Sequence, residues 1–396
     1  MACVTNHEAL EKKPAGRGGS GSGGTFASAG APSNRGGSGG EAASSGGHAD
    51  DEPPGESVLT IVNGVVDAPR IALCLAKVDA DGNVTPLGSP LTDAPLEYGQ
   101  SVVLREVDGV NFDTDGLEPI AIAGELELIR GLDCVAAIER AHAEEARSAG
   151  NPSGEGGAGG DSGGLSAASD AGSGGSAGEG GSGAGDSAGS AGAAAGPPAV
   201  RSALRARGLP AIGAATLNAG RSLVFVANGC MGGATYTGPA ATQYCGADYS
   251  AREPTVSAIL VSLSRQVSDD HVALQAVHAS LANGQVELHS RPPFPSKATG
   301  IGITSVVFGQ VAPRPASISN TVTDLGSARK YLVTVESDGN VLFDVAWSST
   351  LAQGGLSELK SGQGYALIFN GPRADLPAVP NLWNAPTLTA IAVDPE

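Results

Sequence analysis

A strand–corner–strand unit occurs twice in this chain. Its first copy spans residues 59–74 and its second copy spans residues 274–289. Each copy has a short apolar run, a turn-forming break and a second run in which the side chains alternate in character. This pattern predicts two β-strands joined by a corner. Because the two copies lie far apart in the chain, we expect tandem β modules rather than a solenoid of short repeats.

Two further segments recur in the same order as the strand unit. Residues 96–100 match residues 306–310 in pattern, and residues 217–229 match residues 359–371. The first copy holds more residues between its second and third landmarks than the second copy does. We therefore predict that the first module contains an insertion, since loops tolerate added residues at small entropic cost.

The predicted insertion is one of two tracts composed almost entirely of Gly, Ser and Ala. They run from about residue 14 to 55 and from about residue 149 to 198, in a chain with 60 Gly among 396 residues. Both tracts carry too little apolar surface to offset chain entropy, so we predict that they are disordered.

The predicted fold class is mainly β, with two β-sandwich domains of immunoglobulin-like or transthyretin-like type. A disordered tether with a lipid-anchor residue would occupy residues 1–55. The first sandwich would span residues 56–267, with a helical excursion and the disordered insertion over 149–198. The second sandwich would span residues 268–396.

Alternating side chains predict the individual strands. They comprise residues 58–62, 71–75, 101–106 and 222–227, a hairpin of residues 332–336 and 341–345, and an edge strand over 388–393 in either module. Residues 79–83 read Asp-Ala-Asp-Gly-Asn and predict a hairpin turn. Their spacing also suits calcium, but the bidentate Glu that follows in an EF-hand is missing, so the turn is favoured.

One segment has a strong helical pattern. Asp133 can cap a helix that runs to Arg147. The helical stripe would contain Val135, Ile138 and His142. A second helical pattern covers residues 200–207. On the strand that ends the first unit, Ala72, Cys74 and Ala76 share one face, and such small side chains would let another element lie close to the sheet.

Cysteine usage favours an oxidising compartment. Four of the five cysteines fall into neighbouring pairs, Cys74 with Cys134 and Cys230 with Cys245. In the chain-entropy account the shorter loop contributes about 3 kcal/mol and the longer loop roughly 4 kcal/mol. Such bonds persist in exported proteins. Zinc is the competing interpretation, but the sequence has no Cys-x-x-Cys and no clustered His, so we expect neither a metal nor another cofactor.

The fifth cysteine predicts a lipid anchor. Met1-Ala2-Cys3 resembles the end of a bacterial lipobox, in which the cysteine becomes the acylated first residue. The charged start and apolar core of a signal peptide do not precede it here, so either translation starts further upstream or Cys3 is an ordinary residue. We expect anchoring to outer-membrane lipid through Cys3, at the outer membrane or cell surface. Secretion or a periplasmic location is the alternative.

The charge balance excludes one class of partner. The formal net charge is -18, and no basic stripe exists to displace counterions from phosphates, so we expect no nucleic-acid partner. The same charge opposes electrostatic binding to anionic lipid. No apolar run approaches the length of a membrane span.

The two strand units resemble the opening motif of a bacterial family, the domain of unknown function numbered 4397. That family typically opens with Val-Val-His-Ala-Ser-Pro-Asp-Ala-Pro before a strand. The first copy keeps Asp67-Ala68-Pro69 but has Asn63-Gly64 in place of His-Ala, and the second keeps His278-Ala279-Ser280 but not the Pro-Asp-Ala-Pro. The resemblance implies exported or envelope-attached β-sandwich domains, often in tandem and without established enzymatic activity. The layout is also similar to Gram-negative surface lipoproteins with Gly-Ser-Ala tethers.

Candidate catalytic residues are few. Ser38 and Ser176 satisfy Gly-x-Ser-x-Gly, but both lie in Gly-rich tracts that lack the strand and helix of a nucleophile elbow. His278 shares a face with Leu274 and Ala276, which favours a hydrogen-bonded corner residue over a base or ligand. Paired carboxylates occur at residues 113 and 115 and at 269 and 270, without the aromatic residues of a sugar cleft.

We predict a non-enzymatic extracytoplasmic lipoprotein that displays tandem β-sandwiches in a structural or adhesive role. The alternative is a binding module for envelope polysaccharide or a surface partner protein. Its candidate residues are Tyr236 and Tyr244, in the loop between Cys230 and Cys245, together with His278. A hydrolase that uses His278 with a nearby Ser or Asp is a remote alternative.

Overall fold

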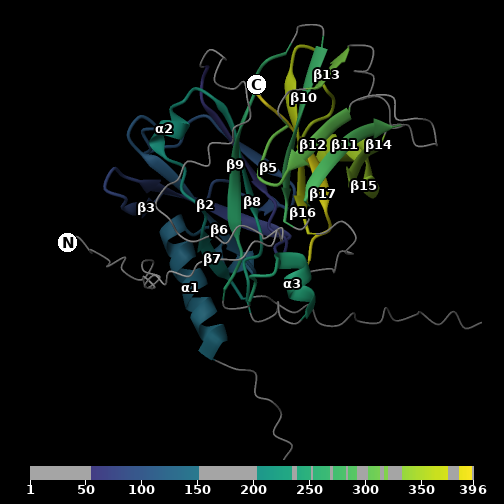
Figure 1. Cartoon of the computed structure of the whole chain (residues 1–396). Helices are drawn as coiled ribbons and strands as arrows, with labels where there is room; N and C mark the ends of the chain where they lie inside the picture. The colour runs from purple at the N-terminus through teal and green to yellow at the C-terminus, as the bar shows by residue number, and fades with distance from the viewer. Residues whose placement is uncertain are drawn as a thin grey trace, which may run out of the picture. The chain divides into compact units, whose positions relative to one another are not determined.

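The computed structural model describes residues 55–150, 203–233, 239–250, 253–267, 271–281, 284–291, 302–312, 316–319, 332–372 and 383–394. The predictions for Cys3, Ser38, Ser176, Tyr236, residues 269 and 270 and nearly all of both Gly-rich tracts lie outside these residues. Within them the fold is mainly β, as predicted, and it is built from several sheets (Figure 1).

The strands fall into two sets. The first set, which we call the first repeat, contains β1 (Val58–Asn63), β2 (Arg70–Val78), β3 (Val84–Pro86), β4 (Leu96–Glu97), β5 (Ser101–Leu104), β6 (Gly116–Ala123), β7 (Arg205–Gly208), β8 (Ser222–Asn228) and β9 (Ser257–Leu263). The second repeat contains β10 (His271–Ser280), β11 (Gln285–Arg291), β12 (Gly302–Val307), β13 (Ala316–Ser319), β14 (Leu332–Ser337), β15 (Asn340–Ala346), β16 (Gly364–Gly371) and β17 (Thr387–Ala392). The helices are η2 (Leu126–Ile129), α1 (Cys134–Gly150), α2 (Ala214–Leu217), α3 (Pro239–Cys245) and α4 (Trp347–Gln353).

The two repeats have the same sheet topology. Sheet A, in the order β5-β1-β8-β9, corresponds to sheet C, in the order β13-β10-β16-β17. Sheet B, β3-β2-β6-β7 with β4 also on β2, corresponds to sheet D, β12-β11-β14-β15. In both A and C the two central strands are parallel, and Leu59 lies opposite Leu223 as Leu274 lies opposite Tyr365. These are the positions that the sequence repeat aligns, so the repeat in the sequence is a repeat in the structure.

Each repeat has an apolar core between its two sheets. In the first, Ile61, Leu73 and Phe225 are buried between sheets A and B. In the second, Leu274, Leu288 and Leu367 are buried between sheets C and D. The strands of the first repeat alternate between this core and the opposite face, so the same sheet also presents apolar side chains outward. Both repeats are therefore β-sandwiches.

A third apolar cluster joins the two sandwiches through the backs of sheets A and C. It contains Val62, Val224, Val226, Val261 and Leu263 from the first repeat and Val277, Ala279, Ala366, Ile368, Ile391 and Val393 from the second. Both repeats belong to one compact unit. The sheets follow one another in the order B, A, C and D, from left to right in Figure 1. The central strands of sheets A and C are thus buried on both faces.

The contact between the sandwiches uses equivalent positions of the two repeats. Val62 corresponds to Val277, and Val226 corresponds to Ile368, in the alignment that the registers define. Such a contact has the pattern of a two-fold interface, in which both partners offer the same surface. Polar bonds add to it, because the Gln275 side chain donates to the Ser264 carbonyl at 2.7 Å and accepts from the Ser264 amide at 2.9 Å.

Helix α1 covers the outer face of sheet B. Asp133 caps it as predicted, since its side chain accepts a hydrogen bond from the Ala136 amide at 2.8 Å. The small side chains of Ala72, Cys74 and Ala76 lie beneath the helix. The predicted stripe is wrong in part, because Val135 is 42% exposed. The buried stripe instead comprises Cys134, Ala137, Ile138 and Ala141, since the sheet, and not the local pattern, determines which face turns inward.

The prediction of a helix over residues 200–207 is wrong. Residues 205–208 form β7, which pairs antiparallel with β6 and completes sheet B. Pairing with a neighbouring strand has overridden the local preference, as tertiary context commonly does. The insertion lies in this β6–β7 connection. Its counterpart is the tight turn between β14 and β15, where Asp338 and Gly339 both have positive φ, of 52° and 75°.

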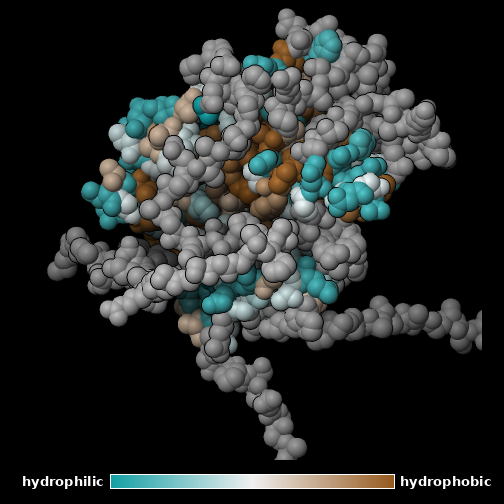
Figure 2. Space-filling model, viewed as in Figure 1, coloured by the Kyte–Doolittle hydropathy of each residue, from teal (hydrophilic) through white to brown (hydrophobic). Residues whose placement is uncertain are grey.

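Other turns and edges follow the sequence. Residues 79–83 join β2 to β3, and the Asp79 carboxylate accepts hydrogen bonds from the amides of Asp81 and Asn83 at 2.9 and 2.8 Å. Strand β17 pairs with β16 and so belongs to the second repeat. Figure 2 shows apolar side chains gathered around β9, where Ile259 and Leu260 are partly exposed.

Candidate functional site

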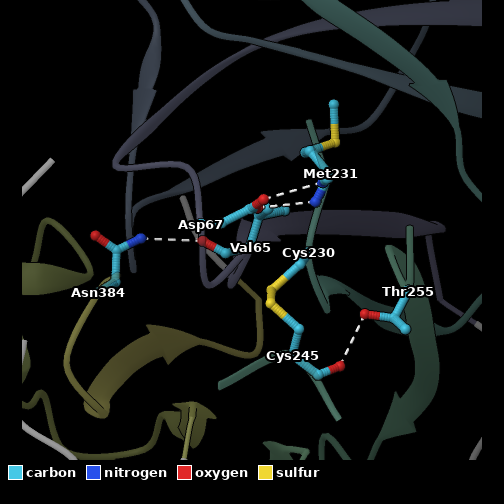
Figure 3. Close-up of a disulfide and its surroundings, with 8 residues drawn as sticks. Val65, Asp67, Cys230, Met231, Cys245, Thr255 and Asn384 are labelled. Carbon is cyan, nitrogen blue, oxygen red and sulfur yellow. Dashed lines mark hydrogen bonds between the residues drawn. A yellow bond between two sulfur atoms is a disulfide. The ribbon is translucent and has the colours of Figure 1, made fainter. Parts of the chain in front are cut away.

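Hydrogen bonds from two distant connections converge on the corner between β1 and β2 (residues 64–69). This corner lies inside the first copy of the repeated strand unit. Two connections meet it, the one that leaves β8 and the one that leads into β17. Because the first belongs to the first repeat and the second to the second repeat, the corner is also a point of contact between them (Figure 3).

Asp67 is the polar centre of the corner and is only 1% exposed. Its carboxylate accepts hydrogen bonds from the backbone amides of Met231 at 2.8 Å and Gly232 at 3.0 Å. Burial raises the pKa of Asp67 to about 6, while the positive charge of Arg205 and the two amide hydrogen bonds oppose that rise. Arg205 comes from β7 and is itself buried. The corner thus holds a carboxyl group that titrates well above its usual range.

The Cys230–Cys245 disulfide lies directly beside this carboxylate. Cys230 precedes Met231, and Cys245 ends α3, so the bond ties the donors of Asp67 to the end of that helix. The carbonyl of Cys245 accepts a hydrogen bond from the Thr255 hydroxyl at 2.8 Å. The disulfide therefore fixes both ends of the loop against the start of β9.

The second repeat reaches the same corner through Trp383 and Asn384. The Asn384 amide donates to the Val66 carbonyl at 2.8 Å, and its side chain donates to the carbonyls of Val65 at 3.0 Å and Ala68 at 3.1 Å. The Trp383 ring stacks on Tyr244, with centroids 4.8 Å apart and planes 10° from parallel. Three corner carbonyls are thereby satisfied by a single residue of the other repeat.

Both disulfides have the predicted pairing, Cys74 with Cys134 and Cys230 with Cys245. They are compatible with an oxidising, extracytoplasmic compartment. Among the residues that the structure describes, no helix is long and apolar enough to cross a membrane. Within the same ranges, no group of His, Cys, Asp and Glu is placed to hold a metal ion.

His278 lies at the equivalent corner of the second repeat, where it corresponds to Asn63. Nδ1 of His278 accepts from the Ser280 amide at 3.2 Å, as the Asn63 side-chain oxygen accepts from the Val65 amide at 3.1 Å. Nε2 of His278 lies 3.1 Å from the Gly284 carbonyl, an arrangement that requires the proton on Nε2. The ring is fully buried against Phe369.

The backbones of Asn63 and His278 are also equivalent. Their amides donate to the carbonyls of Gln100 and Gln310, at 3.0 and 3.2 Å. Their carbonyls accept from Gly99 and Gly309, at 2.7 and 2.9 Å. An amide and an imidazole therefore perform the same structural task in the two repeats.

Of the three candidate binding residues, the structure describes Tyr244 and His278. Tyr244 is buried in the stack with Trp383, His278 is buried in the other corner, and Tyr236 lies outside the described residues. Asp67, Arg205 and Asn384 were not among the predicted site residues. Two features of the sequence could have drawn attention to these residues. One is the Asp-Ala-Pro break after β1, and the other is Trp383, one of only two tryptophans, in a Pro-rich segment. Neither indicates which distant segment would contact the corner.

No protein-family model matches this chain, and no curated protein matches it.

Proposed function

We propose that this protein is a non-enzymatic, extracytoplasmic protein that presents two joined β-sandwiches in a structural or adhesive role. The observation that carries the proposal is the apolar contact between sheets A and C. It makes the two sandwiches a single body, and the disulfides of the first repeat add covalent links within it. Such a cross-linked body suits display at an envelope, because its disulfides persist in an oxidising compartment.

The equivalence of His278 and Asn63 supports the non-enzymatic part of the proposal. A general base needs a proton acceptor that faces its substrate. Both nitrogens of His278 are instead engaged with the backbone of its own corner. The first repeat does the same work with an amide, which cannot act as a base near neutral pH. This argues against the hydrolase alternative.

Anchoring to outer-membrane lipid through an acylated Cys3 belongs to the proposal, as does the resemblance to the tandem bacterial domains. The test is metabolic labelling with a palmitate analogue in cells that express the protein from its native locus. We expect label on the wild type and none on Cys3→Ser, with both proteins present in equal amount. An unlabelled wild type would contradict the anchor.

A second candidate function is binding of envelope polysaccharide or of a surface partner protein. The disulfide-bound position of α3 favours it, because loops held on rigid sandwiches commonly carry binding. A glycan array would compare the wild type with Tyr236→Ala, and Tyr244→Ala would report the effect of losing the stack on Trp383. Equal signals from the wild type and Tyr236→Ala would remove this tyrosine from consideration.

A further inference from the structure

The contacts at the corner form a closed ring that contains one disulfide cross-link. Starting at the disulfide, Cys230 leads to Met231 and Gly232, which donate to Asp67. Beyond Asp67, the neighbouring carbonyls accept from Asn384, and the adjacent Trp383 stacks on Tyr244. Tyr244 precedes Cys245, where the ring closes. Figure 3 shows the part of the ring formed by the disulfide, Asp67 and Asn384. We call this ring the latch.

The latch joins residues of both repeats at one end of their contact. Trp383 and Asn384 lie in the connection that leads from β16 to β17, and every other member belongs to the first repeat. The side chains around Trp383 are apolar and buried, with Val66, Ala241, Tyr244 and Tyr249 in one cluster. Docking of the second repeat's connection therefore depends on the positions of both the corner and α3.

Only the first repeat contributes sulfur to such a ring. In the repeat alignment Gly229 corresponds to Gly371, so Pro372 stands where the first repeat has Cys230. There the Pro372 carbonyl accepts from the Ser280 hydroxyl at 3.3 Å. The disulfide is thus specific to the first repeat and is not a general feature of the fold. It lies at the corner where the second repeat contacts the first.

We propose that the Cys230–Cys245 bond is a covalent latch, whose formation by oxidation holds the Trp383-Asn384 segment of the second repeat on the corner of the first repeat. Without the bond, the donors to Asp67 are no longer held relative to Tyr244. Tyr244, which stacks on Trp383, and the corner carbonyls, which bond Asn384, are then no longer held at a fixed distance from each other. The charged group that acts on Asp67 is Arg205 of β7, whose positive charge lowers the pKa of that carboxyl.

The oxidation step exchanges electrons with a second disulfide. A disulfide of a thiol oxidoreductase, or an oxidised small thiol, accepts the thiolate of one cysteine and forms a mixed disulfide. The second cysteine then attacks its partner's sulfur, which forms the Cys230–Cys245 bond and releases the oxidant as a dithiol or as two thiols. Two electrons and two protons pass from this protein to the oxidant.

Hydrogen exchange of the full-length protein tests the latch. The reporter is the Asn384 amide, which bonds the Val66 carbonyl, and the reference is the set of amides in β16. In Cys230→Ser/Cys245→Ser we expect exchange at Asn384 to rise at least about tenfold more than exchange in β16, because the lost stability affects both while the local release affects Asn384 alone. The matched control is Cys74→Ser/Cys134→Ser, which removes the other disulfide and should leave Asn384 protected relative to β16.

Two outcomes would overturn the proposal. One is equal protection of Asn384 in the wild type and in Cys230→Ser/Cys245→Ser. The other is a rise in exchange that is the same at Asn384 and in β16, because this would mean general loss of structure.

A double-mutant cycle keeps the test decisive if the cysteine variant folds poorly. It combines Cys230→Ser/Cys245→Ser with Asn384→Ala, which removes the side-chain bonds to Val65 and Ala68. If both changes open one ring, the combined loss of stability is smaller than the sum of the separate losses. Additive losses would mean that the disulfide and Asn384 act independently, and the latch would be refuted.

Discussion

The outer faces of sheets B and D differ, although the two sheets have the same strand order. Sheet B presents Ala72, Cys74 and Ala76 to helix α1, and these side chains are buried. At the position of Cys74 the second repeat has His289, which lies 3.3 Å from Glu287 and 3.9 Å from Glu336 on sheet D. One face is apolar and covered, whereas the other is charged.

This difference shows which residues determine the topology of the repeat. The inner faces and the strand pairings are common to both copies, so they suffice for the sandwich. The outer face of the second sheet can change from a helix support to a polar surface without altering the strand order. The β6–β7 connection, which supplies α1, is therefore matched by the small residues beneath that helix.

The largest effect should come from removing the covalent link between α1 and sheet B. Cys74 and Cys134 are fully buried and separated by 60 residues, so we expect Cys74→Ser/Cys134→Ser to lower the free energy of unfolding by about 4 kcal/mol. Urea denaturation followed by circular dichroism would measure the loss. A change below about 1 kcal/mol would mean that packing alone holds the helix.

A smaller effect should appear in the pH dependence of stability at the first corner. Because burial raises the pKa of Asp67 from 3.8 to about 6, the folded state binds this proton more tightly than the unfolded state. The contribution of Asp67 to stability is full below the lower value and falls as the pH rises through about 6, by at most about 3 kcal/mol. Urea unfolding between about pH 4 and 7 measures this slope.

The variant that sharpens this measurement is Asp67→Asn, in which the component from Asp67 should vanish. Asn also loses one of the two acceptors for the amides of Met231 and Gly232, so overall stability falls as well. The exposed Asp113 provides the control, and Asp113→Asn should keep the slope of the wild type. If the free energy of unfolding changed with pH in the same way in the wild type and in Asp67→Asn, burial would not be raising the pKa of Asp67.

Exchanging the two corner residues tests their equivalence. We expect His278→Asn to cost about 1 kcal/mol, because Asn retains an acceptor for the Ser280 amide and loses the Nε2 bond to the Gly284 carbonyl and contact with Phe369. His278→Ala removes the acceptor as well and should cost about 3 kcal/mol. Thermal unfolding would compare them. If both variants lost the same stability, the imidazole would not be acting as the amide does.

The smallest effect should come from the charged outer face of sheet D. His289→Ala removes a partly exposed imidazole beside two carboxylates, so we expect a change of no more than about 0.5 kcal/mol. Thermal unfolding at neutral pH would measure it against the change in Cys74→Ser/Cys134→Ser. If His289→Ala lost as much stability as Cys74→Ser/Cys134→Ser, the outer faces of sheets B and D would contribute equally to stability.

The sequence by itself determined the repeat, the mainly β fold, the disulfide pairs and the cap of α1. These features follow from local periodicity, turn chemistry and cysteine spacing, which need no knowledge of distant neighbours. It also indicated His278 as a corner residue, because the alternation placed it with Leu274 on an inward face.

Only the tertiary structure decided how the two sandwiches meet and what surrounds Asp67. Strands β1 and β8 carry apolar residues on both faces, which means burial on both sides but does not specify the covering sheet. Likewise, residues 205–208 became a strand because β6 offered a free edge. Asn384 reaches Asp67's corner through hydrogen bonds to residues more than three hundred positions away in sequence, and local pattern carries no information about such pairings.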